Sequence, residues 1–117
     1  MIEASCHCGA VRFAVEVAPG EVNDCTCSIC RRYGALWAYY PPAQVQFADG
    51  SGPTDTYVWG ERRLAFHRCS ACGCVTHWSP TDPAWPRMGV NARLMAPETL
   101  AAIPVLRNGV RPGVSEG

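Results

Sequence analysis

Lysine is absent from this sequence of 117 residues, so all ten of its basic residues are arginines. Schiff-base catalysis by a lysine and a phosphate-binding loop that depends on lysine are therefore excluded. Ten acidic residues balance the ten basic ones, so the formal net charge is zero. Because nucleic-acid binding needs an excess of basic residues to neutralise phosphates, we expect no nucleic-acid partner.

Long apolar runs are also missing. No stretch approaches the roughly 20 apolar residues of a membrane span, and the first 13 residues lack the basic start and apolar run of a secretory signal. We therefore expect no membrane partner and a cytoplasmic location, where thiols stay reduced. The eight cysteines could form four disulfides in principle. In a reducing compartment, metal thiolates are the better interpretation.

Helical periodicity is scarce, and short stretches of strand-like alternation take its place. Residues 10–17 put Val11, Phe13, Val15 and Val17 on one face. Residues 45–47, 74–79 and 87–94 also indicate strands, and residues 54–69 indicate a hairpin that turns near Gly60 and Glu61. Only residues 97–103, opened by a proline, suggest a helix. We predict one all-β domain over residues 1–117, built of short antiparallel strands with little helix and a frayed tail from about residue 107.

The cysteines fall into three groups, and two of these complement each other. Cys69 and Cys72, followed by Gly73, form the C-x-x-C-G pattern that is typical of a zinc knuckle. A knuckle supplies two ligands and needs two more. Cys6 and Cys8 are spaced so that both would point to one side of an extended chain. These four cysteines predict a structural zinc site that ties the N-terminus to a distant hairpin.

The remaining group, C-x-C-x-x-C, contains Cys25, Cys27 and Cys30. Three thiolates with one vacant position are typical of a catalytic zinc. Cys74 is then left over, and two interpretations stay open. It could fill the vacant position and so produce two closed structural sites, or it could be a small buried residue without a ligand role. We favour the second, because the other two pairs already complete the first site.

The whole pattern resembles the glutathione-dependent formaldehyde-activating enzyme family, which includes the centromere protein V group. The resemblance rests on C-x-C-G at residues 6–9, C-x-C-x-x-C-R at residues 25–31, C-x-x-C-G at residues 69–73 and the segment VNARL at residues 90–94. It implies an all-β zinc fold called the β-tent, with two zinc ions per chain. The structural ion would be held by Cys6, Cys8, Cys69 and Cys72, and the catalytic ion by Cys25, Cys27 and Cys30.

The resemblance also implies a reaction, the addition of formaldehyde to the thiol of glutathione to give S-hydroxymethylglutathione, which is carbon–sulfur lyase chemistry. The sequence departs from the family in two respects. Position 74 is usually a small hydroxyl residue and is cysteine here. The chain is also shorter than the enzyme that gave the family its name, which bears on the substrate more than on the metal sites.

Several other side chains are candidates for the site. A zinc held by three thiolates can act as a Lewis acid on a carbonyl or bind an incoming thiol as thiolate. Arg31 and Arg32 could pair with substrate carboxylates, or could offset the thiolate charge or face solvent. Three aromatic residues could wall a pocket or pack in the core: Trp37, Tyr39 and Tyr40. The three histidines are candidates for acid–base duty or for ordinary hydrogen bonding: His7, His67 and His77.

Three classes of function follow from this sequence. The first is a zinc-dependent lyase-type enzyme whose partners are a small thiol and an aldehyde. The second is a non-catalytic, zinc-stabilised binding module of the same fold, and the third is a redox or metal-buffering thiol protein. The vacant ligand position favours the enzyme, whereas a closed second site would favour the module. The knuckle glycine and the expected cytoplasmic location disfavour the redox protein.

Overall fold

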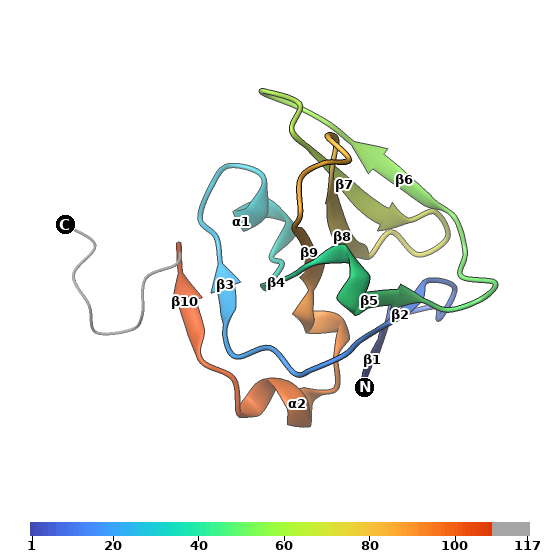
Figure 1. Cartoon of the computed structure of the whole chain (residues 1–117), viewed down its shortest axis with the longest axis vertical. Coiled ribbons are helices and arrows are strands. Elements are labelled where there is room, and N and C mark those ends of the chain that lie inside the picture. Colours follow the sequence, from blue (N-terminus) through green and yellow to red (C-terminus); the bar gives the residue numbers. More distant parts are fainter. Residues whose placement is uncertain (109–117) are drawn as a thin grey trace.

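The computed structural model describes residues 1–108 and consists mainly of two β-sheets (Figure 1). The small sheet has the order β1-β2-β5, with β1 (Ile2–Ser5), β2 (Arg12–Val15) and β5 (Val45–Phe47). The large sheet has the order β10-β3-β4-β9-β8-β7-β6. Its strands are β3 (Val22–Asp24), β4 (Trp37–Tyr40), β6 (Thr54–Tyr57), β7 (Leu64–Cys69), β8 (Val75–Pro80), β9 (Met88–Asn91) and β10 (Val105–Arg107). The predicted all-β class is confirmed.

The strands predicted from alternation are present as β2, β5, β8 and β9, and the predicted hairpin is formed by β6 and β7. The prediction was wrong for Val17, because β2 ends at Val15 and Val17 is exposed. The predicted strand at 87–94 ends at Asn91 and continues as a 3-10 turn over Ala92–Leu94. The expected helix appears as α2 (Pro97–Ala101). We had predicted antiparallel strands, but one pair, β10 with β3, is parallel.

A second helix, α1 (Cys30–Tyr33), was not predicted and contradicts the expectation that only residues 97–103 are helical. It is a single turn, which is too short to produce a detectable helical periodicity. Gly34 ends it in the left-handed conformation, at φ 67°, and donates its N–H to the carbonyl of Cys30 at 3.0 Å. This is a common helix ending, and it turns the chain directly into β4.

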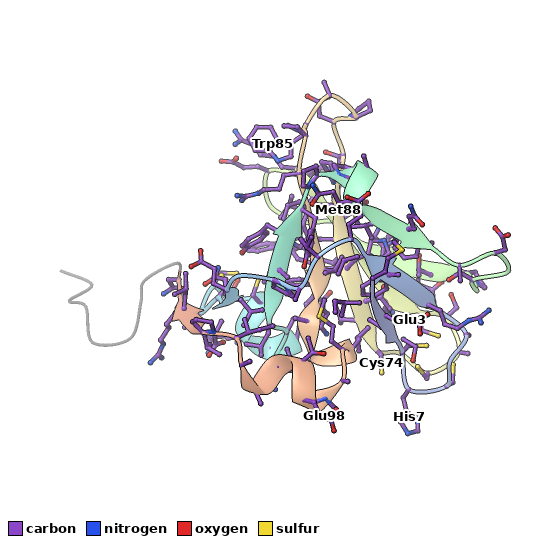
Figure 2. The ribbon with its side chains drawn as sticks, turned by 60° about the horizontal axis from the view of Figure 1, so that its bottom comes forward. Glu3, His7, Cys74, Trp85, Met88 and Glu98 are labelled. Carbon is purple, nitrogen blue, oxygen red and sulfur yellow. The ribbon has the colours of Figure 1, made fainter. Side chains whose placement is uncertain are left out.

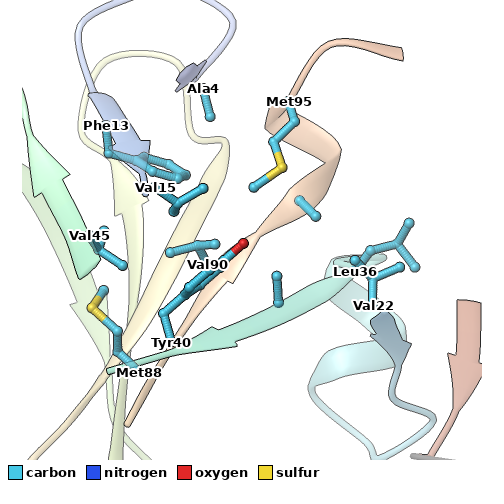
Figure 3. Close-up of a cluster of buried hydrophobic side chains, with 12 residues drawn as sticks. Ala4, Phe13, Val15, Val22, Leu36, Tyr40, Val45, Met88, Val90 and Met95 are labelled. Carbon is cyan, nitrogen blue, oxygen red and sulfur yellow. The ribbon is translucent and has the colours of Figure 1, made fainter. Parts of the chain in front are cut away.

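The main core fills the space between the two sheets (Figure 3). The small sheet contributes Phe13, Val15 and Val45, and the facing strands β4 and β9 contribute Tyr40 and Val90. Val15 and Val90 are fully inaccessible to solvent. Burying side chains of this size contributes about 1.5–3 kcal/mol each. Phe66 of β7 and Trp78 of β8 belong instead to a second cluster of buried side chains, together with Cys30 and Trp37.

The tail that we predicted to be frayed from about residue 107 begins within a paired strand, β10. Leu106 of β10 is buried, and the backbone of Arg107 lies opposite that of Asp24 in the pairing of β10 with β3. The remainder of the predicted tail, residues 109–117, lies outside the described residues. Among residues 1–108, no helix has the length and apolar character that crossing a bilayer requires.

Candidate functional site

Four cysteines, two near the N-terminus and two at the β7–β8 turn, form the first cluster. The Sγ atoms of Cys6, Cys8, Cys69 and Cys72 all lie within 4.8 Å of one another. The Sγ of Cys8 is 3.7 Å from the Sγ of Cys6 and 3.7 Å from that of Cys69. A disulfide would need about 2.05 Å, whereas sulfurs about 2.3 Å from a tetrahedral zinc are about 3.8 Å apart. The spacing therefore fits a zinc ion held by four thiolates.

Two tight turns bring these sulfurs together. Gly73 donates its N–H to the carbonyl of Cys69 at 2.9 Å and has φ 82°, which glycine adopts without strain. Cys6 and Cys8 also lie on a turn, closed by Gly9 at φ 82°, and not on the extended chain that we had predicted. Figure 2 shows His7, between the two ligands, pointing away from the body of the protein.

Backbone N–H groups favour the thiolate form of Cys69 and Cys72, whereas burial and the neighbouring thiols outweigh the Ala10 N–H at Cys8 and raise its pKa to about 11. Val11 donates its N–H to the Sγ of Cys6 at 3.3 Å, and Cys72 donates to the Sγ of Cys69 at 3.5 Å. The N–H groups of Cys74 and Cys8 lower the pKa of Cys72 to about 5. Because thiolates are the form that binds metal, this arrangement prepares the cluster for a cation.

Cys74 lies beside this first cluster. Its carbonyl accepts the N–H of Cys69 at 2.9 Å, and its side chain packs against the small cluster of buried residues around Cys6, Val11 and Cys69. It does not belong to either group of converging thiols within the described residues. The interpretation in which Cys74 closes the second site is therefore wrong, because the β7–β8 turn holds it at the other cluster.

The second cluster combines Cys25, Cys27 and Cys30, whose Sγ atoms also lie within 4.8 Å of one another. Cys25 directly follows β3, and Cys30 is the first residue of α1. The N–H of Cys30 donates to the Sγ of Cys27 at 3.5 Å, and the N–H of Arg31 donates to the carbonyl of Cys27 at 3.1 Å. This local loop turns three sulfurs toward one point, as the C-x-C-x-x-C spacing predicts.

The environments of the three thiols differ. Burial acts to raise the pKa of Cys27, but the N–H groups of Cys30 and Ile29 and the neighbouring thiols outweigh it, so the pKa is lowered. Burial and the Cys27 thiol raise the pKa of Cys30, while the indole of Trp37 opposes this shift. The indole N–H of Trp37 is buried and has no hydrogen-bond partner of ordinary length among the described residues. A thiolate at Cys30 would supply the negative charge that this buried donor lacks.

The VNARL segment holds the chain that follows α1. The side-chain oxygen of Asn91, which is buried, accepts the N–H of Leu36 at 3.3 Å, and its amide group donates to the carbonyl of Val75 at 2.8 Å. Arg93 donates its Nε–H to the carbonyl of Gly34 at 2.6 Å. The segment is thus a structural support for the second cluster, although it contributes no ligand.

A further support comes from Asn108, which sequence reasoning did not identify. Its side-chain oxygen accepts the N–H of Thr26 at 2.8 Å, and its amide group donates to the Thr26 hydroxyl at 2.6 Å. Asn108 adopts φ 54°, a left-handed conformation that asparagine tolerates. Thr26 lies between two of the three cysteines, so Asn108 holds the loop that carries them. The two residues are 82 positions apart in the sequence, and no local signal connects them.

The second cluster opens into a pocket of about 780 Å³, and all three of its cysteines line that pocket. In the described part of the chain, the four cysteines of the first cluster do not line it. Its walls are rich in aromatic side chains: Trp37, Tyr39, Trp59, Phe66, Trp78 and Trp85. Trp37 and Tyr39 thus lie where we expected a pocket wall. Tyr40 points into the core instead, and its hydroxyl donates to the carbonyl of Val17 at 2.9 Å.

Charged residues lie at the pocket, but they differ from those that the sequence suggested. Arg31 and Arg32 are exposed on α1 and, within residues 1–108, are not among those that line the pocket. Arg32 instead donates to the carbonyl of Ser28 at 2.8 Å. The arginines that line the pocket come from the β6–β7 and β8–β9 connections: Arg62, Arg63 and Arg87. These connections are adjacent only in the folded sheet.

The histidines lie elsewhere. Among the described residues, no histidine lines the pocket. His67 and His77 face each other across β7 and β8, and their rings stack with centroids 4.1 Å apart. Phe66 and Trp78, their neighbours in sequence, line the pocket. Because successive side chains of a strand point to opposite faces, the histidine pair lies on the far side of the sheet.

Comparisons with known proteins identify the family of this chain. The family model described as "Glutathione-dependent formaldehyde-activating enzyme" matches residues 1–104. A protein of Halomonas elongata, provisionally named a glutathione-dependent formaldehyde-activating enzyme, is 36% identical, with 75% of this chain and 60% of that protein covered. The chain thus spans about 60% of that relative's length. A crystal structure of a Rhodobacter sphaeroides protein is 31% identical, with a TM-score of 0.70, and covers 89% of this chain and 99% of that one. The chain belongs to the glutathione-dependent formaldehyde-activating enzyme family.

Proposed function

We propose that this protein is a zinc-dependent enzyme of the carbon–sulfur lyase type, which adds a small thiol to an aldehyde and binds two zinc ions per chain. Cys6, Cys8, Cys69 and Cys72 would hold a structural ion, and Cys25, Cys27 and Cys30 a catalytic one. Glutathione and formaldehyde are the first pair to test, because they are the substrates in the family's name. A cytoplasmic location suits the proposal, since all eight cysteines of the described chain are free.

One observation supports this function above all: the two clusters differ in what surrounds them. None of the four cysteines of the first cluster lines the pocket, and their role would be to join the N-terminal turn to the β7–β8 turn. The three-cysteine cluster lines the pocket with every one of its sulfurs. An incomplete ligand set at the floor of a cavity is the arrangement that catalytic zinc sites use.

A zinc ion at this cluster would supply Lewis acidity toward a carbonyl oxygen, or would stabilise an incoming thiol as thiolate. In the overall addition a sulfur–carbon bond forms, the carbonyl double bond becomes single, and the thiol proton ends on the oxygen. Tyr39, which lines the same pocket as the three cysteines, would assist at that oxygen. Asn23 donates its amide hydrogen to the Tyr39 hydroxyl oxygen at 2.9 Å, which leaves the phenolic hydrogen available to a substrate. Burial raises the pKa of Tyr39, so its hydroxyl stays protonated at neutral pH.

Two groups of arginines would contact the thiol substrate, one inside the pocket and one outside it. Arg62 and Arg87 line the pocket and are suited to a carboxylate inside it. Arg31 and Arg32, exposed on α1, would meet only the parts of a substrate that extend beyond the pocket. The acidic residues of the lining are already engaged. Glu61 pairs with Arg63 at 2.9 Å, and Asp82 accepts the N–H of Ala84 at 2.9 Å.

The alternative, a non-catalytic binding module, depended on a second site closed by a fourth cysteine. Cys74 was the remaining candidate for that role, and it lies at the first cluster. Figure 2 places Cys74 and Trp85, a pocket residue, toward opposite ends of the molecule. The basis for preferring the module is therefore removed.

The test is a rate measurement, because thiols add to formaldehyde without a catalyst. Exchange NMR on glutathione and formaldehyde should show faster approach to equilibrium with the zinc-loaded protein than without it. The Cys27→Ser variant at equal protein concentration is the control, and it should fall to the background rate. Equal rates for the wild type and Cys27→Ser would show that the protein does not catalyse this reaction.

A further inference from the structure

The pocket at the second cluster is lined by all four tryptophans of the chain, together with Phe66 and Tyr39. Trp37 and Trp78 are buried at its base, while Trp59 and Trp85 are 43% and 53% exposed. Large exposed aromatic side chains at one place mark a surface that something apolar covers. Formaldehyde has a single carbon, and glutathione is a polar peptide without an aromatic ring. Neither has an apolar surface that would use these walls.

One charged group of this lining, Arg62, is without a partner among the described residues. Arg63 pairs with Glu61, and the guanidinium of Arg87 lies over the Tyr39 ring, 4.4 Å from its centroid. Within residues 1–108, the guanidinium of Arg62 makes no ion pair, hydrogen bond or ring contact. The pocket therefore presents aromatic walls together with two guanidinium groups that make no ion pair within residues 1–108, and of these Arg62 is also free of ring contacts.

The edge of the pocket that carries Arg62 is held in place. Arg62 itself adopts φ 60°, which is unfavourable for a residue with a side chain. Its N–H donates to the carbonyl of Trp59 at 2.9 Å, and its carbonyl accepts the hydroxyl of Thr81 at 2.7 Å. The N–H of Thr81 donates in turn to the carbonyl of Arg63 at 2.9 Å. The two connections that supply Trp59 and Trp85 are thus joined across the sheet edge, and the strained residue is fixed at the pocket.

We propose that the pocket binds a substrate with an aromatic ring and a negatively charged group, the ring packing against Trp59 and Trp85 and the charge pairing with Arg62. The proposal rests on the proposed function, because it places the reacting end of this substrate at the three-cysteine cluster. It extends that function by assigning an aromatic acid to the pocket, as the thiol or the aldehyde partner. Planar aromatic contacts and an arginine–carboxylate pair are both strong recognition elements.

A binding experiment with unreactive probes separates the two features. Three probes suffice: 2-naphthoate, which has ring and charge; 2-naphthylmethanol, which has the ring alone; and acetate, which has the charge alone. Isothermal titration calorimetry with the zinc-loaded protein should show that 2-naphthoate binds roughly tenfold more tightly than 2-naphthylmethanol. Acetate should show no binding at the same concentrations, because it has no surface for the aromatic walls.

Two variants assign the binding to the named residues. Trp85→Ala should weaken 2-naphthoate binding roughly tenfold, and Arg62→Gln should abolish the preference for 2-naphthoate over 2-naphthylmethanol. The matched controls lie outside the pocket. Tyr57→Ala removes another exposed aromatic side chain, and Arg12→Gln removes another exposed arginine. Neither control should alter either affinity, and zinc content is measured for every variant.

The proposal is overturned if 2-naphthoate does not bind, or if Trp85→Ala binds it as the wild type does. It is also overturned if Arg62→Gln keeps the preference for 2-naphthoate, since the carboxylate would then be held elsewhere, for example by the metal. Failure here is distinct from failure of the proposed reaction. Catalysis of glutathione addition without 2-naphthoate binding would refute the pocket assignment alone. Binding as described, without any catalysed addition, would refute the reaction and leave the pocket assignment standing.

Discussion

Replacing one cysteine in each cluster should separate a structural site from a working one. Cys69 is 2% exposed, and its sulfur meets that of Cys8 across 61 positions of the sequence. A cross-link over a loop of that length contributes about 4 kcal/mol through the entropy of the unfolded chain. The second cluster closes a loop of only six residues, Cys25 to Cys30. The logarithmic dependence on loop length makes its contribution smaller by about 2 kcal/mol.

Cys69→Ser should therefore lower the free energy of unfolding by about 4 kcal/mol, or roughly 15 °C in Tm for a domain of this size. Cys27→Ser should cost about 2 kcal/mol or less, and should remove the activity. Differential scanning calorimetry of the reduced, zinc-loaded proteins measures both shifts, and metal analysis shows which ion each variant has lost. If Cys27→Ser destabilises the protein as much as Cys69→Ser does, the division into a structural and a catalytic site is wrong.

Three further predictions concern residues outside the two groups of converging thiols. Cys74→Ser should retain two zinc ions per chain by metal analysis, since Cys74 belongs to neither group of converging thiols; loss of one ion would make it a ligand. Asn108→Ala should release zinc from the second cluster roughly tenfold faster to a competing chelator, with the first cluster unchanged; equal release rates would show that the contact with Thr26 has no such role. Burial, with a smaller effect of His67, lowers the pKa of His77 to about 3, so the unfolded chain binds a proton more readily than the folded one between about pH 6.5 and 3. The free energy of unfolding should consequently fall as the pH falls through that window. Urea denaturation at pH 7 and at pH 4.5 measures this loss, and the loss should be roughly 2–3 kcal/mol smaller in His77→Gln than in the wild type. Identical losses in the two proteins would mean that His77 is not the responsible group.

Local patterns in the sequence predicted the parts of this structure that depend on near neighbours. Cys25, Cys27 and Cys30 converge because their spacing is enough to bring them together within one loop. The pairing of Cys6 and Cys8 with Cys69 and Cys72 is long-range, yet it was predictable because two incomplete ligand sets each need two more sulfurs.

The pocket could not be predicted in the same way. Its cation, Arg62, and its outer aromatic residue, Trp85, lie on connections that only the strand order β9-β8-β7-β6 brings together. Asn108 reaches Thr26 through the parallel pairing of β10 with β3, which alternation along a single strand does not reveal. Arg31 and Arg32 were chosen for their position next to a ligand in sequence, but α1 directs them outward. Proximity in sequence was a good guide to the thiols that converge and a poor guide to the residues that line the pocket.

The most direct test of the central claim is a crystal structure of the zinc-loaded protein, with diffraction data collected on both sides of the zinc absorption edge. The account predicts two anomalous peaks per chain. One should lie among the sulfurs of Cys6, Cys8, Cys69 and Cys72, and the other should be bound by Cys25, Cys27 and Cys30, with its fourth position facing the aromatic pocket. A single peak at the first cluster, or a second ion whose fourth ligand is another protein side chain, would contradict the account.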